Sequence, residues 1–167
     1  MAIKDAILPE YDHELATTRR LLERIPEQHA DWKPHVKSMS LGQLGAHIAN
    51  LPFWGILTMK QTELDLNPPG GPGFRSPTFE STQGTVARFD ENAKQAREAI
   101  AAGSDEDMKT SWTLKNGGQT VLTLPRAAVL RSFVINHMIH HRGQLSVYLR
   151  LHDVPIPSIY GPTADEA

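Results

Sequence analysis

Three histidines stand close together in the stretch NHMIHHRGQ, residues 136–144, and two of them have the spacing of a metal-binding pair. His137 and His141 are four residues apart, so on a helix they lie one turn apart and about 40° from each other. Two imidazoles in this arrangement can bind one cation. The pair is therefore a candidate metal site with nitrogen ligands.

The helix face that carries His137 is predicted to point into the protein core. The residues within about 60° of His137 on a helical wheel are apolar or aromatic: Leu130, Phe133, Val134, Tyr148 and Leu151. Gln144 lies about 20° away, whereas Arg131, Arg142 and Arg150 lie outside this face. An unpaired buried polar group costs on the order of 1–3 kcal/mol. The two inward imidazoles therefore need partners, and one metal ion would satisfy both.

His47 is the third candidate ligand, because it also falls on an apolar helix face, among Leu44, Leu51, Trp54 and Thr58. If this helix is a neighbour of the one that carries His137 and His141, three neutral imidazoles can bind one cation and leave positions open for water or substrate. Each histidine alone has a simpler interpretation, as a core residue satisfied by a backbone carbonyl. His140 could also replace His141, although its angle is poorer. The combination of three such histidines in a chain without cysteine favours a metal site.

Further residues are expected to surround these ligands. Gln144, Trp54 and Tyr148 are predicted to orient the ligands or to line a substrate pocket. The segment LNPPGGPGFRSP, residues 66–77, holds four prolines and three glycines, so it cannot continue a helix and is too long for a tight turn. We expect its part Asn67–Phe74 to border the entrance to the site.

Four segments with helical periodicity must position these residues: Ile3–Ile25, Leu41–Glu63, Glu80–Ala102 and Pro125–His152. Ser40 and Gln43 have the spacing of a capping box at the start of the second segment. The pattern predicts an all-α fold, an antiparallel four-helix bundle that forms a single domain over residues 1–167. Asn116-Gly117 lies between two β-prone runs and predicts a short β-hairpin before the last helix, with an irregular connector as the alternative.

The composition is that of a globular protein and excludes several classes of function. The chain has 167 residues, of which 40% are hydrophobic and 22% charged, and a net charge of −2. This balance gives no electrostatic basis for binding nucleic acid or an anionic membrane. The absence of cysteine excludes disulfides, zinc ribbons and a thiol nucleophile from the chain itself. No apolar run is long enough for a membrane helix and the N-terminus does not have the pattern of a signal peptide, so we expect a cytoplasmic protein.

The sequence resembles the DinB family of damage-inducible and YfiT-like four-helix proteins over nearly its whole length. The similar segments are IPEQHADWKPHVKSMSLGQLGAHIAN (25–50), NHMIHHRGQL (136–145) and VPIPSIYGPTADE (154–166). The resemblance implies that His47, His137 and His141 bind one divalent metal, commonly zinc or nickel, with water completing the shell. It also implies a homodimer. Related families include transferases that use low-molecular-weight thiols such as bacillithiol or mycothiol, and a thiol-dependent isomerase.

The function expected first is a metal-dependent transferase that joins an external low-molecular-weight thiol to small electrophiles in stress or detoxification. A metal ion lowers the pKa of a thiol, and the thiolate is the nucleophile. A metal-dependent hydrolase is the second interpretation, ranked lower because no carboxylate is placed on the His137 face. A metal-binding stress protein or a helical dimerisation module is the non-enzymatic alternative.

Overall fold

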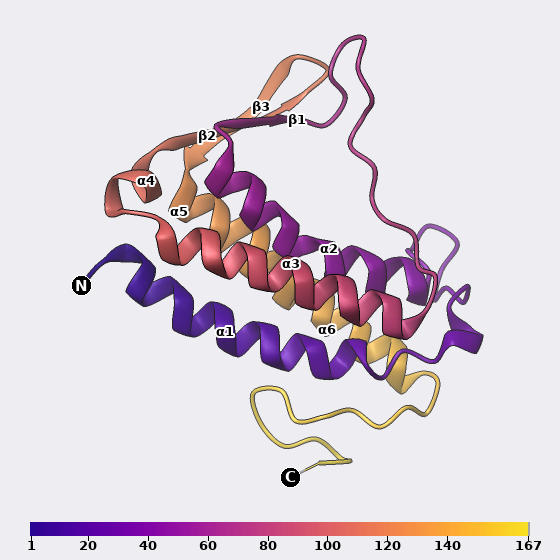
Figure 1. Ribbon diagram of the computed structural model, residues 1–167. Coiled ribbons are helices and arrows are strands. Elements are labelled where there is room, and N and C mark those ends of the chain that lie inside the picture. The colour runs from indigo at the N-terminus through magenta and orange to yellow at the C-terminus, as the bar shows by residue number, and fades with distance from the viewer. Residues whose placement is uncertain (167) are drawn as a thin grey trace.

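The computed structural model describes residues 1–166 and shows a mostly helical chain with one small sheet (Figure 1). The helices are α1 (Ile3–Leu22), α2 (Leu41–Lys60), α3 (Thr82–Ala102), α4 (Asp105–Lys109), α5 (Arg126–Val129) and α6 (His137–Arg150). The strands are β1 (Glu63–Asp65), β2 (Ser111–Asn116) and β3 (Gln119–Pro125). The prediction of an all-α four-helix bundle is therefore corrected to a helical fold with a three-stranded sheet at one end.

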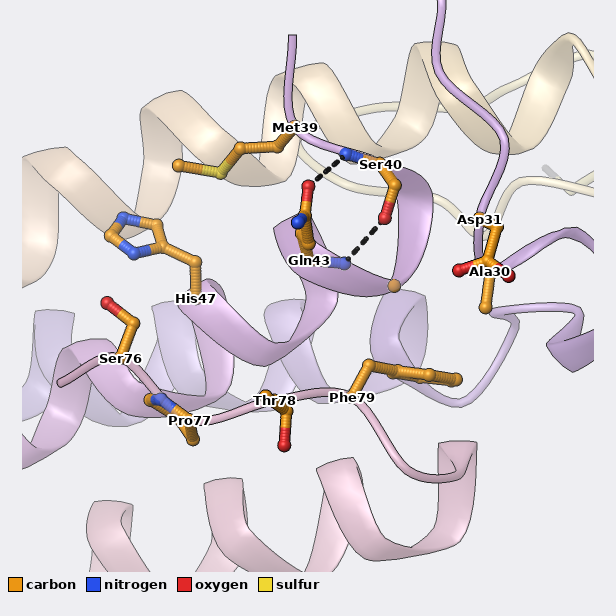
Figure 2. Close-up of a pocket in the computed structure, with 11 residues that line it drawn as sticks. Ala30, Asp31, Met39, Ser40, Gln43, His47, Ser76, Pro77, Thr78 and Phe79 are labelled. Carbon is orange, nitrogen blue, oxygen red and sulfur yellow. Dashed lines mark hydrogen bonds between the residues drawn. The ribbon is translucent and has the colours of Figure 1, made fainter.

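Helices α1, α2 and α3 begin and end within three residues of the predicted bounds, whereas the predicted segment Pro125–His152 is covered by α5, a π-helical stretch and α6. At the start of α2, the Ser40 hydroxyl accepts the backbone N–H of Gln43 at 3.2 Å, and the Gln43 side chain accepts the N–H of Ser40 at 2.9 Å (Figure 2). This pair is the predicted capping box. It stabilises the first turn of α2, about two turns before His47.

The main core lies where the long helices pack against one another. Its buried members come from all four of them and include Leu21, Leu22, Leu44, Ile48, Leu51, Phe89, Met138, Leu145 and Leu149. Burial of such side chains is worth about 1.5–3 kcal/mol each, so this core holds α2 and α6 in contact. The contact brings the His47 face of α2 against the face of α6 that carries His137 and His141.

The sheet contains the predicted hairpin and one strand that the sequence did not predict. Strands β2 and β3 pair antiparallel and turn at Gly117 and Gly118, whose φ angles of 62° and 78° favour glycine. Strand β1 pairs parallel with β2. The Asp65 carboxylate at the end of β1 accepts the backbone N–H groups of Asn67, Gly117 and Gly118. One carboxylate therefore joins the start of the Pro/Gly segment to the hairpin turn.

The last helical segment is not one regular α-helix. Between α5 and α6, residues Leu130–Asn136 form a π-helix, in which hydrogen bonds span five residues rather than four. Phe133 in this stretch is half-buried and packs against the cluster of Trp112, Leu114 and Val129 beneath the sheet. The π-helix ends where His137 begins α6.

Arg142 is buried, although the helical wheel placed it outside the core-facing side. Only 1% of its side chain is exposed, and it forms an ion pair at 2.6 Å with Glu14 of α1, whose side chain is 6% exposed. The Tyr160 hydroxyl accepts from Arg142 at 2.6 Å and lies 2.9 Å from both Glu14 carboxylate oxygens. Glu14 and Tyr160 thus cover the guanidinium. A helical wheel of one helix does not include contacts from other segments, so it did not predict this burial.

Among the helices of residues 1–166, none is both long and apolar enough to cross a bilayer.

Candidate metal centre

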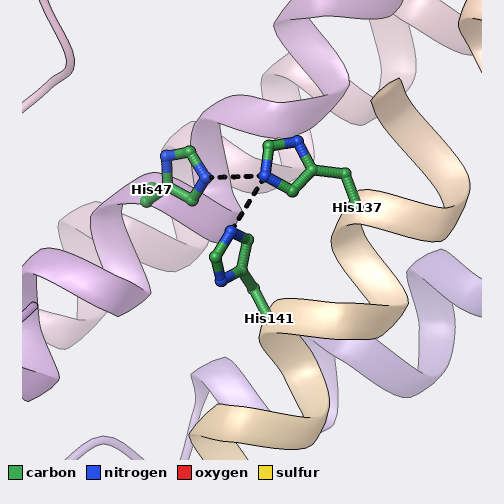
Figure 3. A group of neighbouring side chains, drawn as sticks. All are labelled: His47, His137 and His141. Atoms are coloured by element: carbon green, nitrogen blue, oxygen red, sulfur yellow. Dashed lines mark hydrogen bonds between the residues drawn. The ribbon is translucent and has the colours of Figure 1, made fainter. Parts of the chain in front are cut away.

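The three predicted ligands converge between α2 and α6 (Figure 3). The Nε2 atom of His137 lies 2.9 Å from Nε2 of His141 and 3.4 Å from Nε2 of His47. One ring nitrogen of each histidine lies within 4.8 Å of the other two. The rings are half-buried, so the cluster is neither sealed in the core nor free in solvent.

A hydrogen bond at the far side of the His141 ring leaves its facing nitrogen free to bind a cation. His141 Nδ1 lies 2.7 Å from Gln144 Oε1, and a carbonyl oxygen only accepts, so Nδ1 carries the proton and Nε2 carries a lone pair. The Nε2 atom of His137 faces the Nε2 atoms of both other rings, at 2.9 Å from His141 and 3.4 Å from His47, and a neutral imidazole can present a lone pair there. A cation placed between these nitrogens would be bound by both rings at once. The donor set therefore fits a divalent cation held by imidazole nitrogens.

The environment keeps all three imidazoles neutral at pH 7, the form that binds metals. Burial, together with the neighbouring rings of His141 and His137, lowers the pKa of His47 to about 4. Burial also lowers the pKa values of His137 and His141. The bonds to Phe133 and Gln144 act in the opposite direction but do not reverse these shifts.

A cavity of about 490 Å³ opens beside the cluster, and His47 lies in its wall (Figure 2). The other walls come from the connector before α2, the first turn of α2 and the segment 76–79. The predicted border, Asn67–Phe74, does not line this cavity. Within that stretch, Phe74 packs edge-on against Trp54 with ring centroids 5.6 Å apart. The part of the Pro/Gly segment that reaches the cavity is therefore its end, from Ser76 to Phe79.

Of the remaining predicted residues, only Gln144 forms a hydrogen bond with one of the three histidines. Gln144 contacts a candidate ligand directly. Trp54 stacks on Phe133 with centroids 6.5 Å apart, and Tyr148 meets Trp32 edge-on at 5.5 Å; neither Trp54 nor Tyr148 lines the cavity. His140 is exposed and lies outside the group of three ligand atoms.

Sequence reasoning missed the parts of the site that tertiary contacts create. Asp31 and Phe79 line the cavity, yet both stand in connectors without periodicity. The Pro/Gly segment signalled that a loop approaches the site, but not which of its residues does so.

Comparison with known proteins identifies the family to which this chain belongs. The family model described as DinB superfamily matches residues 10–145. The chain belongs to the DinB superfamily. Its resemblance to DinB proteins, predicted from three sequence segments, is thereby confirmed.

This DinB chain is similar to proteins from two Bacillus species. It is 26% identical to the uncharacterized protein YrdA of Bacillus subtilis strain 168, over 97% of this chain and 90% of YrdA. A crystal structure of a DinB-like protein from Bacillus cereus ATCC 10987 matches with a TM-score of 0.72 and 21% identity, over 93% of this chain and 97% of the other. A crystal structure of the DinB-like protein YjoA from Bacillus subtilis matches with a TM-score of 0.67 and 19% identity, over 96% of this chain and 98% of the other. These structures share the DinB fold.

Proposed function

We propose that His47, His137 and His141 bind one divalent cation and that the protein transfers a low-molecular-weight thiol to small electrophiles. The observation that carries this proposal is the convergence of three imidazoles, one ring nitrogen of each lying within 4.8 Å of the other two, with the His141 ring oriented by Gln144. Zinc and nickel are the metals we expect, since both accept three imidazoles and keep further positions open.

A divalent cation in this position would lower the pKa of a thiol ligand, so that the thiolate forms at neutral pH. The chain itself has no cysteine, so the thiol comes from solution. In the reaction, the sulfur forms a bond to the electrophilic carbon, the leaving group departs with its electron pair, and the thiol proton passes to solvent. The cavity beside His47 admits the reactants, and Gln144 holds the His141 ring in place.

The composition of the cluster supports thiol transfer over hydrolysis. Within residues 1–166, no aspartate or glutamate belongs to the group of converging ligand atoms. Activation of water normally uses a nearby general base, whereas a thiol deprotonates readily once its pKa is lowered. Hydrolysis is therefore kept as an outcome of the test rather than as the proposal.

The test begins with elemental analysis of tag-free protein. We expect about one equivalent of metal, lost in His47→Ala and in His137→Ala but retained in His140→Ala, which changes an exposed histidine of the same helix. The loaded protein is then assayed with small thiols and monochlorobimane, which becomes fluorescent on thiol addition. Absence of metal after dialysis against zinc or nickel would refute the proposal. Ester hydrolysis without thiol transfer would replace it by the hydrolase interpretation.

A further inference from the structure

The cavity beside the metal centre has two chemically different ends. His47 lies at one end, and Ala30 and Asp31 lie at the opposite end (Figure 2). Between them, α2 rises by five residues from Gly42 to His47, which is about 7.5 Å along the helix axis. A single molecule that contacts both ends must therefore be extended.

Asp31 is the charged group of this cavity. Among the lining residues that the structure describes, it is the only aspartate, glutamate, lysine or arginine. The Asp31 side chain is exposed and makes no ion pair or hydrogen bond with any residue of the range 1–166. Its carboxylate is thus available to a cationic ligand.

The backbone at this end of the cavity does not offer a competing site for an anion. A helix N-terminus binds anions through its free N–H groups, but the first three N–H groups of α2 are already used. Those of Leu41 and Gly42 donate to the carbonyls of Trp32 and Ala30, at 2.9 and 2.8 Å. That of Gln43 donates to the Ser40 hydroxyl. The only charge presented to a ligand here is therefore negative.

The walls between the two ends suit a chain of mixed polarity. Met39 and Phe79 provide apolar surface, and Ser76 and Thr78 provide hydroxyl groups. The Gln43 side chain accepts from Ser40 through Oε1, which leaves its amide N–H groups to donate. Such walls can accompany methylene groups and amide or hydroxyl groups alike.

Resting on the function proposed above, we propose that the thiol substrate is an extended molecule with a distal protonated amine, which pairs with Asp31 while the sulfur lies at the three-histidine cluster. A short aminothiol has its sulfur and nitrogen too close together to reach both ends. Asp31 is then a specificity-determining residue, since it selects an ammonium group at a fixed distance from the sulfur.

The test compares matched thiols by calorimetric titration of zinc-loaded protein. Aminohexanethiol carries a distal ammonium, and mercaptohexanol has the same length without the charge. We expect aminohexanethiol to bind about two- to fivefold more tightly, because an ion pair with an exposed carboxylate contributes about 1 kcal/mol or less. The pair cysteamine and mercaptoethanol should show no such difference. Asp31→Asn should abolish the preference, whereas Glu80→Gln, which removes an exposed charge beside Phe79 without lining the cavity, should retain it.

The possible outcomes separate this inference from the function on which it rests. Equal affinities for the two long thiols, or a preference that survives Asp31→Asn, would overturn the Asp31 subsite while zinc and thiol binding stand. Failure of the same sample to hold zinc would overturn the proposed function and this inference with it. Circular dichroism of Asp31→Asn, expected to match the parent protein, verifies that the exposed substitution leaves the fold intact.

Discussion

Replacing Glu14 by glutamine is expected to destabilise the protein by several kcal/mol, because it leaves the Arg142 charge buried without a counter-ion. The two side chains are 6% and 1% exposed and their charged atoms lie 2.6 Å apart. Removing one partner of such a buried pair costs about 3–5 kcal/mol, against a total stability of about 5–15 kcal/mol for a typical domain. For a chain of this size, the loss corresponds to a fall in melting temperature of roughly 6–20 °C.

The measurement is urea unfolding followed by circular dichroism, with Asp12→Asn as the matched control. Asp12 also lies on α1 and pairs with an arginine, Arg97, but these side chains are 41% and 49% exposed. Exposed pairs contribute about 0–1 kcal/mol, so the control should lose little. A double variant, Glu14→Leu with Arg142→Met, should recover most of the stability because it removes both charges. A Glu14→Gln loss no larger than that of Asp12→Asn would refute the reasoning.

Three further predictions concern the metal centre and the sheet. Gln144→Leu should weaken metal binding by about 10–100-fold, because the His141 ring loses the group that orients it; competition with a chromophoric chelator measures this, and an unchanged affinity would contradict it. Metal-free protein should lose stability as the pH falls from 6.5 toward 4, because the folded state holds the pKa of His47 at about 4 against an ordinary 6.5, so the unfolded state binds more protons in this window. Urea unfolding at several pH values checks the slope, which should be shallower in His47→Ala. Asp65→Asn should speed hydrogen exchange of the hairpin-turn amides that its carboxylate accepts, and equal exchange rates would show that the turn holds without it.

Much of the fold and of the candidate site could be predicted from sequence patterns that span only a few residues. The capping box placed the start of α2, and the Asn116-Gly117 signal placed the hairpin, because both depend on residues a few positions apart. The convergence of His47 with His137 was also foreseeable. Two apolar helix faces must meet to form a core, and polar groups on both faces then lie together.

Contacts between distant segments were not foreseeable from the sequence. Strand β1 exists because it pairs with β2, about fifty residues later, and its three residues carry no pattern of their own. The burial of Arg142 requires Glu14 from α1 and Tyr160 from the tail. The cavity takes Asp31 and Phe79 from irregular connectors. In each case the deciding contact joins residues that are far apart in the sequence, whereas helical patterns relate residues only three or four positions apart.

The π-helical stretch Leu130–Asn136 separates α5 from α6. The directions in which the side chains of α5 and of α6 point around the helix axis are therefore independent of each other. A π-turn holds one residue more than an α-turn, so loss of a residue there can be absorbed by winding the stretch as α-helix. The packing of Val129 under the sheet and the direction of His137 would both survive such a deletion. A deletion between His137 and His141, by contrast, would rotate the two histidines away from each other. Length variation in this helix among related proteins should therefore concentrate before His137, and an alignment that forbids gaps in helices would misplace the histidines.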